Sequence, residues 1–283
     1  MMKRGLVLEG GGMRGLYTAG VLDYFMDEGI EFDYCIGVSA GACHASSYLS
    51  KQRGRSFRIN TAYLEDGRYV GVKNLLRTGS MFGMDFIFDE IPNRLDPFDY
   101  DTFLKNPCEF VAGVTDVQTG KPAYFGIEAM NHDATVLRAS SAIPVFSPIV
   151  EFRGRKFLDG GTSDPIPFEK ALRDGCGALV VVLTQHRGYE KSPEKFRAVY
   201  KRLYGQYPEM VATLDRRHEV YNESRRRVFQ LEREGKAVVI APARPVGISR
   251  FEKDLGKLRA LYESGYADAK AAVKAAAPGF FRP

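Results

Sequence analysis

Two glycine-rich strings near the N-terminus contain the residues best suited to do chemistry. Residues 10–15 read Gly-Gly-Gly-Met-Arg-Gly, and residues 37–41 read Gly-Val-Ser-Ala-Gly. The second string has the G-x-S-x-G form of a nucleophile elbow, a sharp turn from strand to helix that exposes the hydroxyl of Ser39. The first is a glycine loop whose backbone N–H groups can face an anion, or an oxygen that becomes one. Together they indicate acyl transfer.

A serine hydroxyl is a weak nucleophile until a base, usually a histidine, takes its proton. The chain has four histidines, His44, His132, His186 and His218. A helix after the elbow would carry His44 more than one turn away from Ser39. His186 follows an apolar run and could reach the edge of a sheet, whereas the other two lie in polar surroundings. We interpret each of them as a surface residue rather than the base.

Asp159 is the stronger partner for the serine. It ends the extended run 156–158 and precedes Gly160-Gly161, so the backbone can bend close to another loop there. Active sites of open α/β sheets gather at such strand ends. An aspartate in this position can equally stabilise its own turn, and the local sequence does not decide between the two roles.

The elements that must position these residues follow a strand–loop–helix pattern. Residues 5–9 and 32–38 predict strands, and residues 16–27 and 40–49 predict the helices that follow them. Two such units in succession favour parallel strands with helices packed on the sheet.

The remaining elements are less regular. We expect residues 55–104 to be irregular and the chain beyond residue 186 to be mainly helical. A helix over 251–277 should pack on the domain through an apolar face. Further strands are expected at 110–117, 122–125, 178–183 and 236–241, an extended stretch with a hairpin at 149–158, and short helices at 135–140 and 168–173.

Length and composition favour one α/β domain over residues 1–283. The chain has 283 residues and 45% hydrophobic content, which is enough for one large core. No apolar run is long enough to span a membrane, and residues 1–12 lack the apolar core of a signal peptide. The four cysteines form no C-x-x-C pair, which argues against a disulfide framework or a zinc site. We therefore expect a cytoplasmic protein.

The net charge of +5 is unevenly distributed. Residues 187–257 contain 17 Lys and Arg against 10 Asp and Glu. Such an excess could attract an anionic membrane surface or nucleic acid. We prefer the interpretation of solvated helix faces, because most of these basic residues alternate with acids.

Three blocks of the sequence resemble the signatures of the patatin-like phospholipase family. They are residues 9–15, residues 37–41 and Asp159-Gly160-Gly161, in the family's order. Residues 139–144, Ala-Ser-Ser-Ala-Ile-Pro, also resemble the segment that commonly precedes the aspartate block. The resemblance covers residues 4–185, and the part beyond, 186–283, is less diagnostic.

The resemblance implies a three-layer α/β/α fold with a mainly parallel sheet and a Ser–Asp dyad without histidine. Ser39 would be the nucleophile and Asp159 the base, and the backbone around Gly11, Gly12 and Met13 would form the oxyanion hole. The implied reaction is hydrolysis of lipid or phospholipid acyl esters through an acyl-enzyme. No metal or organic cofactor and no nucleic acid partner is expected, and contact with a membrane surface is left open.

Two charged residues, Glu9 and Arg14, lie just before and within the glycine loop. Glu9 stands where the family often has aspartate, at a position without a catalytic role. Arg14 places a cation in the first turn of a helix, against the helix dipole, so an anionic substrate group or a structural carboxylate should favour it. We prefer the interpretation that Arg14 stabilises the loop.

Other functions remain open on the sequence. Residues 10–15 also satisfy G-x-G-x-x-G, but the second strand ends in Ser39 rather than in the acid that would hold a ribose. An ordinary α/β-hydrolase would place a histidine near the C-terminus, whereas the last one here is His218. A non-catalytic nucleotide- or lipid-binding protein is the remaining alternative.

An apolar patch at 81–88 has two interpretations. The patch could line an acyl groove or form a mobile cap, and its residues are Met81, Phe82, Met84, Phe86, Ile87 and Phe88. We slightly prefer a local hydrophobic cluster under a long loop.

Overall fold

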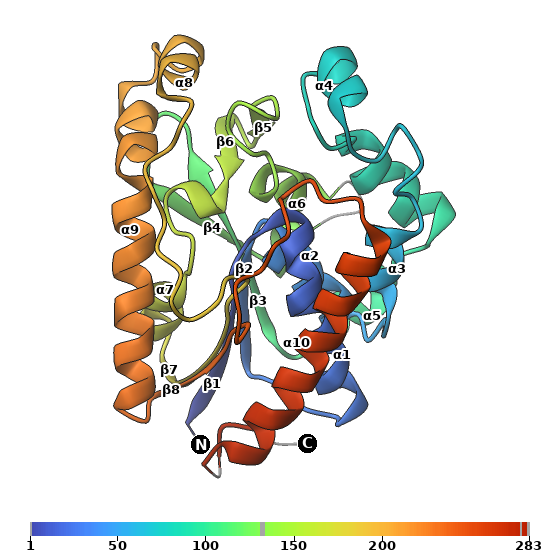
Figure 1. Cartoon of the computed structure of the whole chain (residues 1–283), viewed down its shortest axis with the longest axis vertical. Helices are drawn as coiled ribbons and strands as arrows, with labels where there is room; N and C mark the ends of the chain where they lie inside the picture. The colour runs from blue at the N-terminus through green and yellow to red at the C-terminus, as the bar shows by residue number, and fades with distance from the viewer. Residues whose placement is uncertain (1, 131–133, 278, 282–283) are drawn as a thin grey trace.

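The computed structural model describes residues 2–130, 134–277 and 279–281. A mixed sheet crosses the centre of the molecule, with helices on both of its faces (Figure 1). Within the described residues the sheet has eight strands, in the order β5-β6-β3-β2-β1-β7-β8, and β4 also pairs with β3. The strands are β1 (Lys3–Leu8), β2 (Tyr34–Val38), β3 (Glu109–Asp116), β4 (Pro122–Gly126), β5 (Val150–Phe152), β6 (Arg155–Asp159), β7 (Cys176–Val182) and β8 (Ala237–Ile240).

The helices connect these strands or follow them. They are α1 (Leu16–Asp27), α2 (Ala40–Leu49), α3 (Arg55–Thr61), α4 (Val72–Thr78), α5 (Tyr100–Lys105), α6 (Thr135–Ser140), α7 (Phe168–Arg173), α8 (Arg197–Leu203), α9 (Pro208–Arg233) and α10 (Leu255–Ala275). Four further helical segments are η1 (Gly12–Gly15), η2 (Phe86–Leu95), η3 (Ile127–Ala129) and η4 (Gly160–Thr162).

The predicted three-layer arrangement is confirmed. Strands β3, β2, β1, β7 and β8 are parallel to one another, whereas β4, β5 and β6 add antiparallel pairs. Leu6 and Leu8 face the layer that contains α1, α2 and α10, and Val7 faces α7 and α9. Because helices cover both faces of the sheet, the central strands are mostly apolar and do not alternate between apolar and polar residues.

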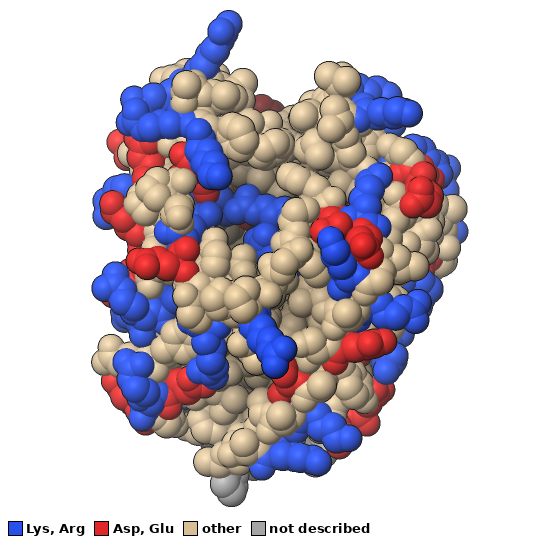
Figure 2. Space-filling view, in the orientation of Figure 1, with Lys and Arg blue, Asp and Glu red and all other residues tan. Residues whose placement is uncertain are grey.

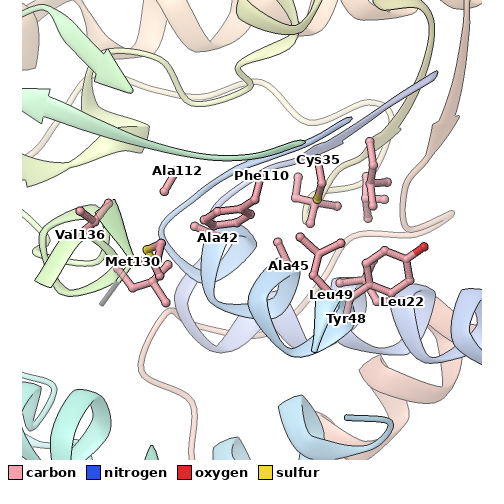
Figure 3. Packing of buried hydrophobic residues seen from close by; sticks show 14 of the residues in the cluster. Leu22, Cys35, Ala42, Ala45, Tyr48, Leu49, Phe110, Ala112, Met130 and Val136 are labelled. Carbon is pink, nitrogen blue, oxygen red and sulfur yellow. The ribbon is translucent and has the colours of Figure 1, made fainter. Parts of the chain in front are cut away.

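Small side chains let α2 lie close against the sheet. Ala42 and Ala45 on α2 lie beneath Cys35 of β2 and Phe110 of β3 (Figure 3). A Cβ added at Gly41 would lie 2.5 Å from the carbonyl oxygen of Leu8. The start of α2 is therefore held against the ends of the central strands.

Two glycines allow α10 to cross α1 in close contact, as the predicted packing of this helix requires. A Cβ at Gly20 would lie 2.0 Å from the carbonyl oxygen of Tyr262, and one at Gly265 would lie 2.0 Å from that of Tyr17. The helix begins at Leu255 rather than at residue 251, because the Asp254 carboxylate caps it by accepting the N–H of Lys257 at 3.0 Å.

The prediction that residues 55–104 are irregular is wrong, since α3, α4, η2 and α5 lie there. These helices are short, and glycines with positive φ, Gly54 and Gly79, bound two of them. Pro92 lies inside η2. No apolar period is long enough in such a segment to be read from the sequence. Within the described ranges, no helix combines the length and the apolar character that crossing a membrane requires.

Candidate active site

Two strands meet end to end beside β3. β2 pairs with β3 up to Gly113, which lies opposite Val38, and β6 pairs with the same edge from Val114 onward, opposite Asp159. β4 occupies the other edge of β3. Ser39, the residue after β2, therefore lies next to the last residue of β6.

The turn at Ser39 has the strand-to-helix form that the motif predicts. Ser39 has φ 53° and ψ −129°, a conformation that non-glycine residues rarely adopt, and it is only 6% exposed. Its N–H donates to the hydroxyl of Ser140 at 2.8 Å, and that hydroxyl donates to the carbonyl of Gly113 at 2.7 Å. Ser140, at the end of α6, thus ties the strained turn to β3.

Asp159 is buried and held from several sides. Its N–H donates to the carbonyl of Ala142 at 2.9 Å, and its Oδ1 accepts the N–H of Gly161 at 2.8 Å. Burial raises the pKa of Asp159, and the nearby Arg217, the Ser39 hydroxyl and the N–H of Gly161 offset this rise only partly. The carboxyl therefore both stabilises its own turn and faces the serine.

The glycine loop passes close to the chain before α10. Gly12 has a φ of +57°, and a Cβ there would lie 2.6 Å from the carbonyl oxygen of Arg250. The N–H of Met13 donates to that same carbonyl at 3.1 Å. The N–H groups of Gly11 and Gly12 donate no hydrogen bond to any residue that the structure describes. Two of the three predicted donors are thus free, and that of Met13 is occupied.

The three histidines that the structure describes form no hydrogen bond with Ser39 or Asp159. His44 is buried rather than on the surface as predicted, because α2 turns it toward Gly15. Burial lowers its pKa to about 4, so the ring is neutral at neutral pH. His186 and His218 are partly exposed, and His132 lies outside the described residues.

Two pockets open on either side of Ser39. We call one the cationic pocket; its charged lining is Glu9, Arg14, Asp159, Lys191, Arg217 and Arg250. We call the other the apolar pocket; its lining includes Met13, Cys43, Tyr69, Met84, Ile87 and Phe88. Ser39, Gly12 and Ile143 line both pockets.

The apolar patch at 81–88 divides between pocket and cluster. Phe82, Met84, Ile87 and Phe88 line the apolar pocket. Phe86 instead packs against the ring of Tyr63, and the guanidinium of Arg68 lies 4.3 Å from its ring centre. The preferred interpretation of a local cluster therefore describes Phe86, and is incomplete for the four lining residues.

Three cations of the pocket come from the basic region and were missed by sequence reasoning. Lys191, Arg217 and Arg250 line the cationic pocket beside Arg14. The only sequence signal was the charge excess of residues 187–257, because no motif links positions so far apart. Other basic residues of this region form surface ion pairs, such as Arg197 with Asp215 at 2.8 Å.

Glu9 has a structural environment. Its carboxylate accepts the N–H of Thr184 at 2.6 Å and the hydroxyl of Tyr221 at 2.7 Å. It thus links the end of β1 to the end of β7 and to α9.

Comparison with known proteins places this chain in a family. A family model described as patatin-like phospholipase matches residues 6–172, which include the glycine loop, Ser39 and Asp159. A second, described as a domain of unknown function (DUF6363), matches residues 207–278, which supply α9, β8 and α10. β8 extends the central sheet, so this segment is continuous with the same layers.

Individual relatives agree with this match. The uncharacterized protein YjjU of Escherichia coli (strain K12) is 29% identical over 266 residues, which are 92% of this chain and 74% of that protein. Lysophospholipase nte1 of Aspergillus terreus is 26% identical over 181 residues, 59% of this chain but 11% of that protein. The crystal structure of VipD from Legionella pneumophila has a TM-score of 0.55 at 14% identity, covers 97% of this chain and 67% of that one, and so shares its fold. Since the first family model matches more than half of the 283 residues, the chain belongs to the patatin-like phospholipase family.

Proposed function

We propose that this protein hydrolyses fatty-acyl esters of lipids, with Ser39 as nucleophile and Asp159 as base. The observation that carries the proposal is that Ser39 and the buried carboxyl of Asp159 lie side by side in one pocket, where β2 and β6 meet. The family and the lysophospholipase among the relatives support a lipid ester as substrate.

The reaction follows from these two groups. Ser39 Oγ attacks the ester carbonyl while Asp159 accepts its proton, and a tetrahedral oxyanion forms. The oxyanion collapses, and the alcohol leaves with the proton from Asp159. Asp159 then takes a proton from the water that attacks the acyl-enzyme, and returns this proton to Ser39 Oγ as the bond to the acyl group breaks and the fatty acid leaves. A base whose pKa is raised by burial suits both directions of this proton transfer.

The oxyanion hole in this proposal uses the free N–H groups of Gly11 and Gly12. Met13 was predicted as a third donor, but its N–H is bonded to the carbonyl of Arg250 and would contribute only if that bond broke. Loss of one oxyanion donor typically costs about 10²–10³ in rate.

The apolar pocket is the proposed place for the acyl chain. It begins at Ser39 and continues between Met84, Ile87 and Phe88. Each buried CH₂ contributes about 0.8 kcal/mol at best, so a chain that fits gains affinity with length until the pocket ends.

Contact with a lipid surface is part of the proposal. Phe196, Val199 and Leu203, on and just before α8, are 44–51% exposed, and Val72 and Leu76 on α4 are 62% and 83% exposed. Figure 1 places α8 and α4 at the same end of the molecule, one on each side. Apolar side chains interleaved with lysine and arginine suit an anionic membrane surface.

Hydrolysis and covalent labelling test the proposal together. The wild type should cleave p-nitrophenyl octanoate and react with a fluorophosphonate probe, and Ser39→Ala should do neither. Ser264→Ala, a change at an exposed serine on α10, is the matched control and should behave as wild type. Absence of labelling in a folded wild type would instead favour a binding module, which calorimetry with NAD, ATP and lysolipids would then identify.

A further inference from the structure

We propose that the cationic pocket binds an anionic group, a phosphate or a carboxylate, on the alcohol side of the ester. The inference rests on the proposed function in one respect, that Ser39 marks the position of the ester carbonyl. It adds a specificity site built largely by the C-terminal part of the chain.

The first observation is how these cations are held. Arg217 donates from Nε to the carbonyl of Gly161 at 2.9 Å and pairs with Glu194 at 2.9 Å. Lys191 pairs with the same carboxylate at 3.1 Å. Their side chains are 13% and 12% exposed. The single carboxylate of Glu194 thus holds two largely buried cations, and its one negative charge compensates only half of their positive charge.

The second observation is that the other two cations have no partner. Toward the residues that the structure describes, the side chains of Arg14 and Arg250 form neither an ion pair nor a hydrogen bond. The Nε of Arg14 is buried without any acceptor. Buried charges are normally paired, because removal from water is costly. An incoming anion would supply the missing acceptors.

The net charge of the pocket also favours an anion as the ligand. Four cations, Arg14, Lys191, Arg217 and Arg250, stand against three carboxylates, those of Glu9, Asp159 and Glu194. Both oxygens of Glu9 are already bonded, and Asp159 faces Ser39. Figure 2 shows basic side chains inside the hollow on this face of the molecule.

Electrostatic strain within the cluster agrees with the geometry. Burial and the repulsion of Arg217 and Arg14 lower the pKa of Arg250 to about 10. Burial and the repulsion of Arg217 lower the pKa of Lys191 to about 8. The positive charges of Arg250 and Lys191 therefore cost free energy in this pocket, and an anion would offset that cost.

The position of the two pockets assigns the anion to the alcohol. Gly12, Ser39 and Ile143 separate the pockets and line both. An ester whose acyl chain enters the apolar pocket must direct its alcohol into the cationic pocket. Phosphate and carboxylate are both suitable, because a guanidinium donates to either in a charge-assisted pair.

A series of short esters with one acyl chain tests the site. The substrates are 1-octanoyl-glycerol 3-phosphate, octanoyl-glycolate, 1-octanoyl-glycerol and octanoyl-choline, all below micelle formation. We expect kcat/KM to be about 10–100-fold higher for the preferred anionic ester than for neutral octanoyl-glycerol, the effect of one or two charge-assisted bonds. The phosphate and glycolate arms show which anion is preferred. Equal rates for all four esters would overturn the proposal.

Matched variants assign the effect to the pocket. Arg250→Met should lower kcat/KM far more for the anionic ester than for the neutral one, and so remove most of the preference. Arg216→Met, which changes the exposed neighbour of Arg217 on α9, should keep the full preference. Loss of the preference in Arg216→Met as well would point to the overall charge and contradict the site.

A binding measurement separates this inference from the proposed hydrolase. The probe is 1-O-octyl-glycerol 3-phosphate, an ether that cannot be hydrolysed, titrated by calorimetry into wild type and Arg250→Met. Binding that depends on Arg250 supports the site even if no ester is cleaved. Hydrolysis with no Arg250-dependent binding of this ether, or of its carboxylate counterpart O-octyl-glycolate, would leave the hydrolase standing and the site refuted.

Discussion

The cationic pocket and the apolar pocket meet at Ser39, but different parts of the chain build them. The lining of the apolar pocket comes from positions between Gly12 and Ile143, all within the family match of residues 6–172. In the cationic pocket, Lys191, Arg217 and Arg250 lie beyond that match. In the proposed reaction, the reacting groups and the acyl side thus belong to one segment, and most of the alcohol side to another. Under this proposal, specificity for the alcohol could change while Ser39 and Asp159 stay in place.

The largest expected effect is a fall in kcat that is the same whichever group occupies the two pockets. Asp159→Asn should lower kcat by about 10³–10⁴ for every ester, anionic or neutral, because the base is lost. His44→Ala should change kcat by less than about tenfold, because its Nε2 forms no hydrogen bond with any residue that the structure describes. A severe loss in His44→Ala with a mild one in Asp159→Asn would replace the dyad with another arrangement.

The pH dependence of kcat/KM also tests Asp159 as the base. Because burial raises the pKa of Asp159, the base is protonated at a higher pH than an ordinary aspartate. kcat/KM for neutral octanoyl-glycerol should therefore fall on the acid side at a pH above the usual aspartate range. An acid limb at an ordinary aspartate pKa would argue against the buried carboxyl as the base.

The next effect is at the loop that separates the pockets. Gly12→Ala places a Cβ against the carbonyl of Arg250 in a conformation that alanine disfavours, and so displaces the N–H donors. We expect kcat to fall about 10²–10³-fold for all esters, with thermal unfolding as the check on the fold. A change confined to KM would show that the loop binds substrate rather than the oxyanion.

A smaller effect should distinguish the apolar pocket. Phe88→Ser should flatten the rise of kcat/KM with acyl length, which at about 0.8 kcal/mol per CH₂ is roughly fourfold per carbon at most. The preference for an anionic alcohol should persist. Leu104→Ser, at an exposed leucine on α5, is the control. A steady fall of kcat/KM from acetyl upward in the wild type would indicate an esterase for small substrates.

The smallest effect concerns the charge of the cationic pocket. Lys191 has a pKa of about 8 and faces Glu194, Arg217 and Arg250, so it is charged below that pH and neutral above it. The preference for an anionic ester should decline a few-fold as the pH rises through 8. Lys191→Met should show the lower preference at every pH. A decline that persists unchanged in Lys191→Met would have to come from another group.

Sequence reasoning succeeded where the signal was local. The apolar period of α1, the continuous apolar run of β7 and the G-x-S-x-G turn before α2 are visible in short stretches, and the structure has these elements close to the predicted bounds. The short helices of 55–104 were missed because each is too brief to show a period. The cationic pocket was missed for another reason: Lys191, Arg217 and Arg250 converge only after α9 and the chain before α10 have packed beside the glycine loop.

The same limit explains the loop itself. From the sequence, Gly11, Gly12 and Met13 were equivalent N–H donors, because nothing local distinguishes them. The structure distinguishes them through Arg250, whose carbonyl occupies the N–H of Met13. A tertiary contact from the far end of the chain decides which donors are free.

Trapping the acyl-enzyme tests the central claim, that Ser39 forms the covalent intermediate, most directly. Wild-type protein is mixed with p-nitrophenyl octanoate, quenched with acid within the first turnover, digested and analysed by mass spectrometry. The account predicts an octanoyl group on Ser39, and none in Ser39→Ala. An octanoyl group on any other residue, or rapid release of p-nitrophenol with no acylated peptide, would contradict it.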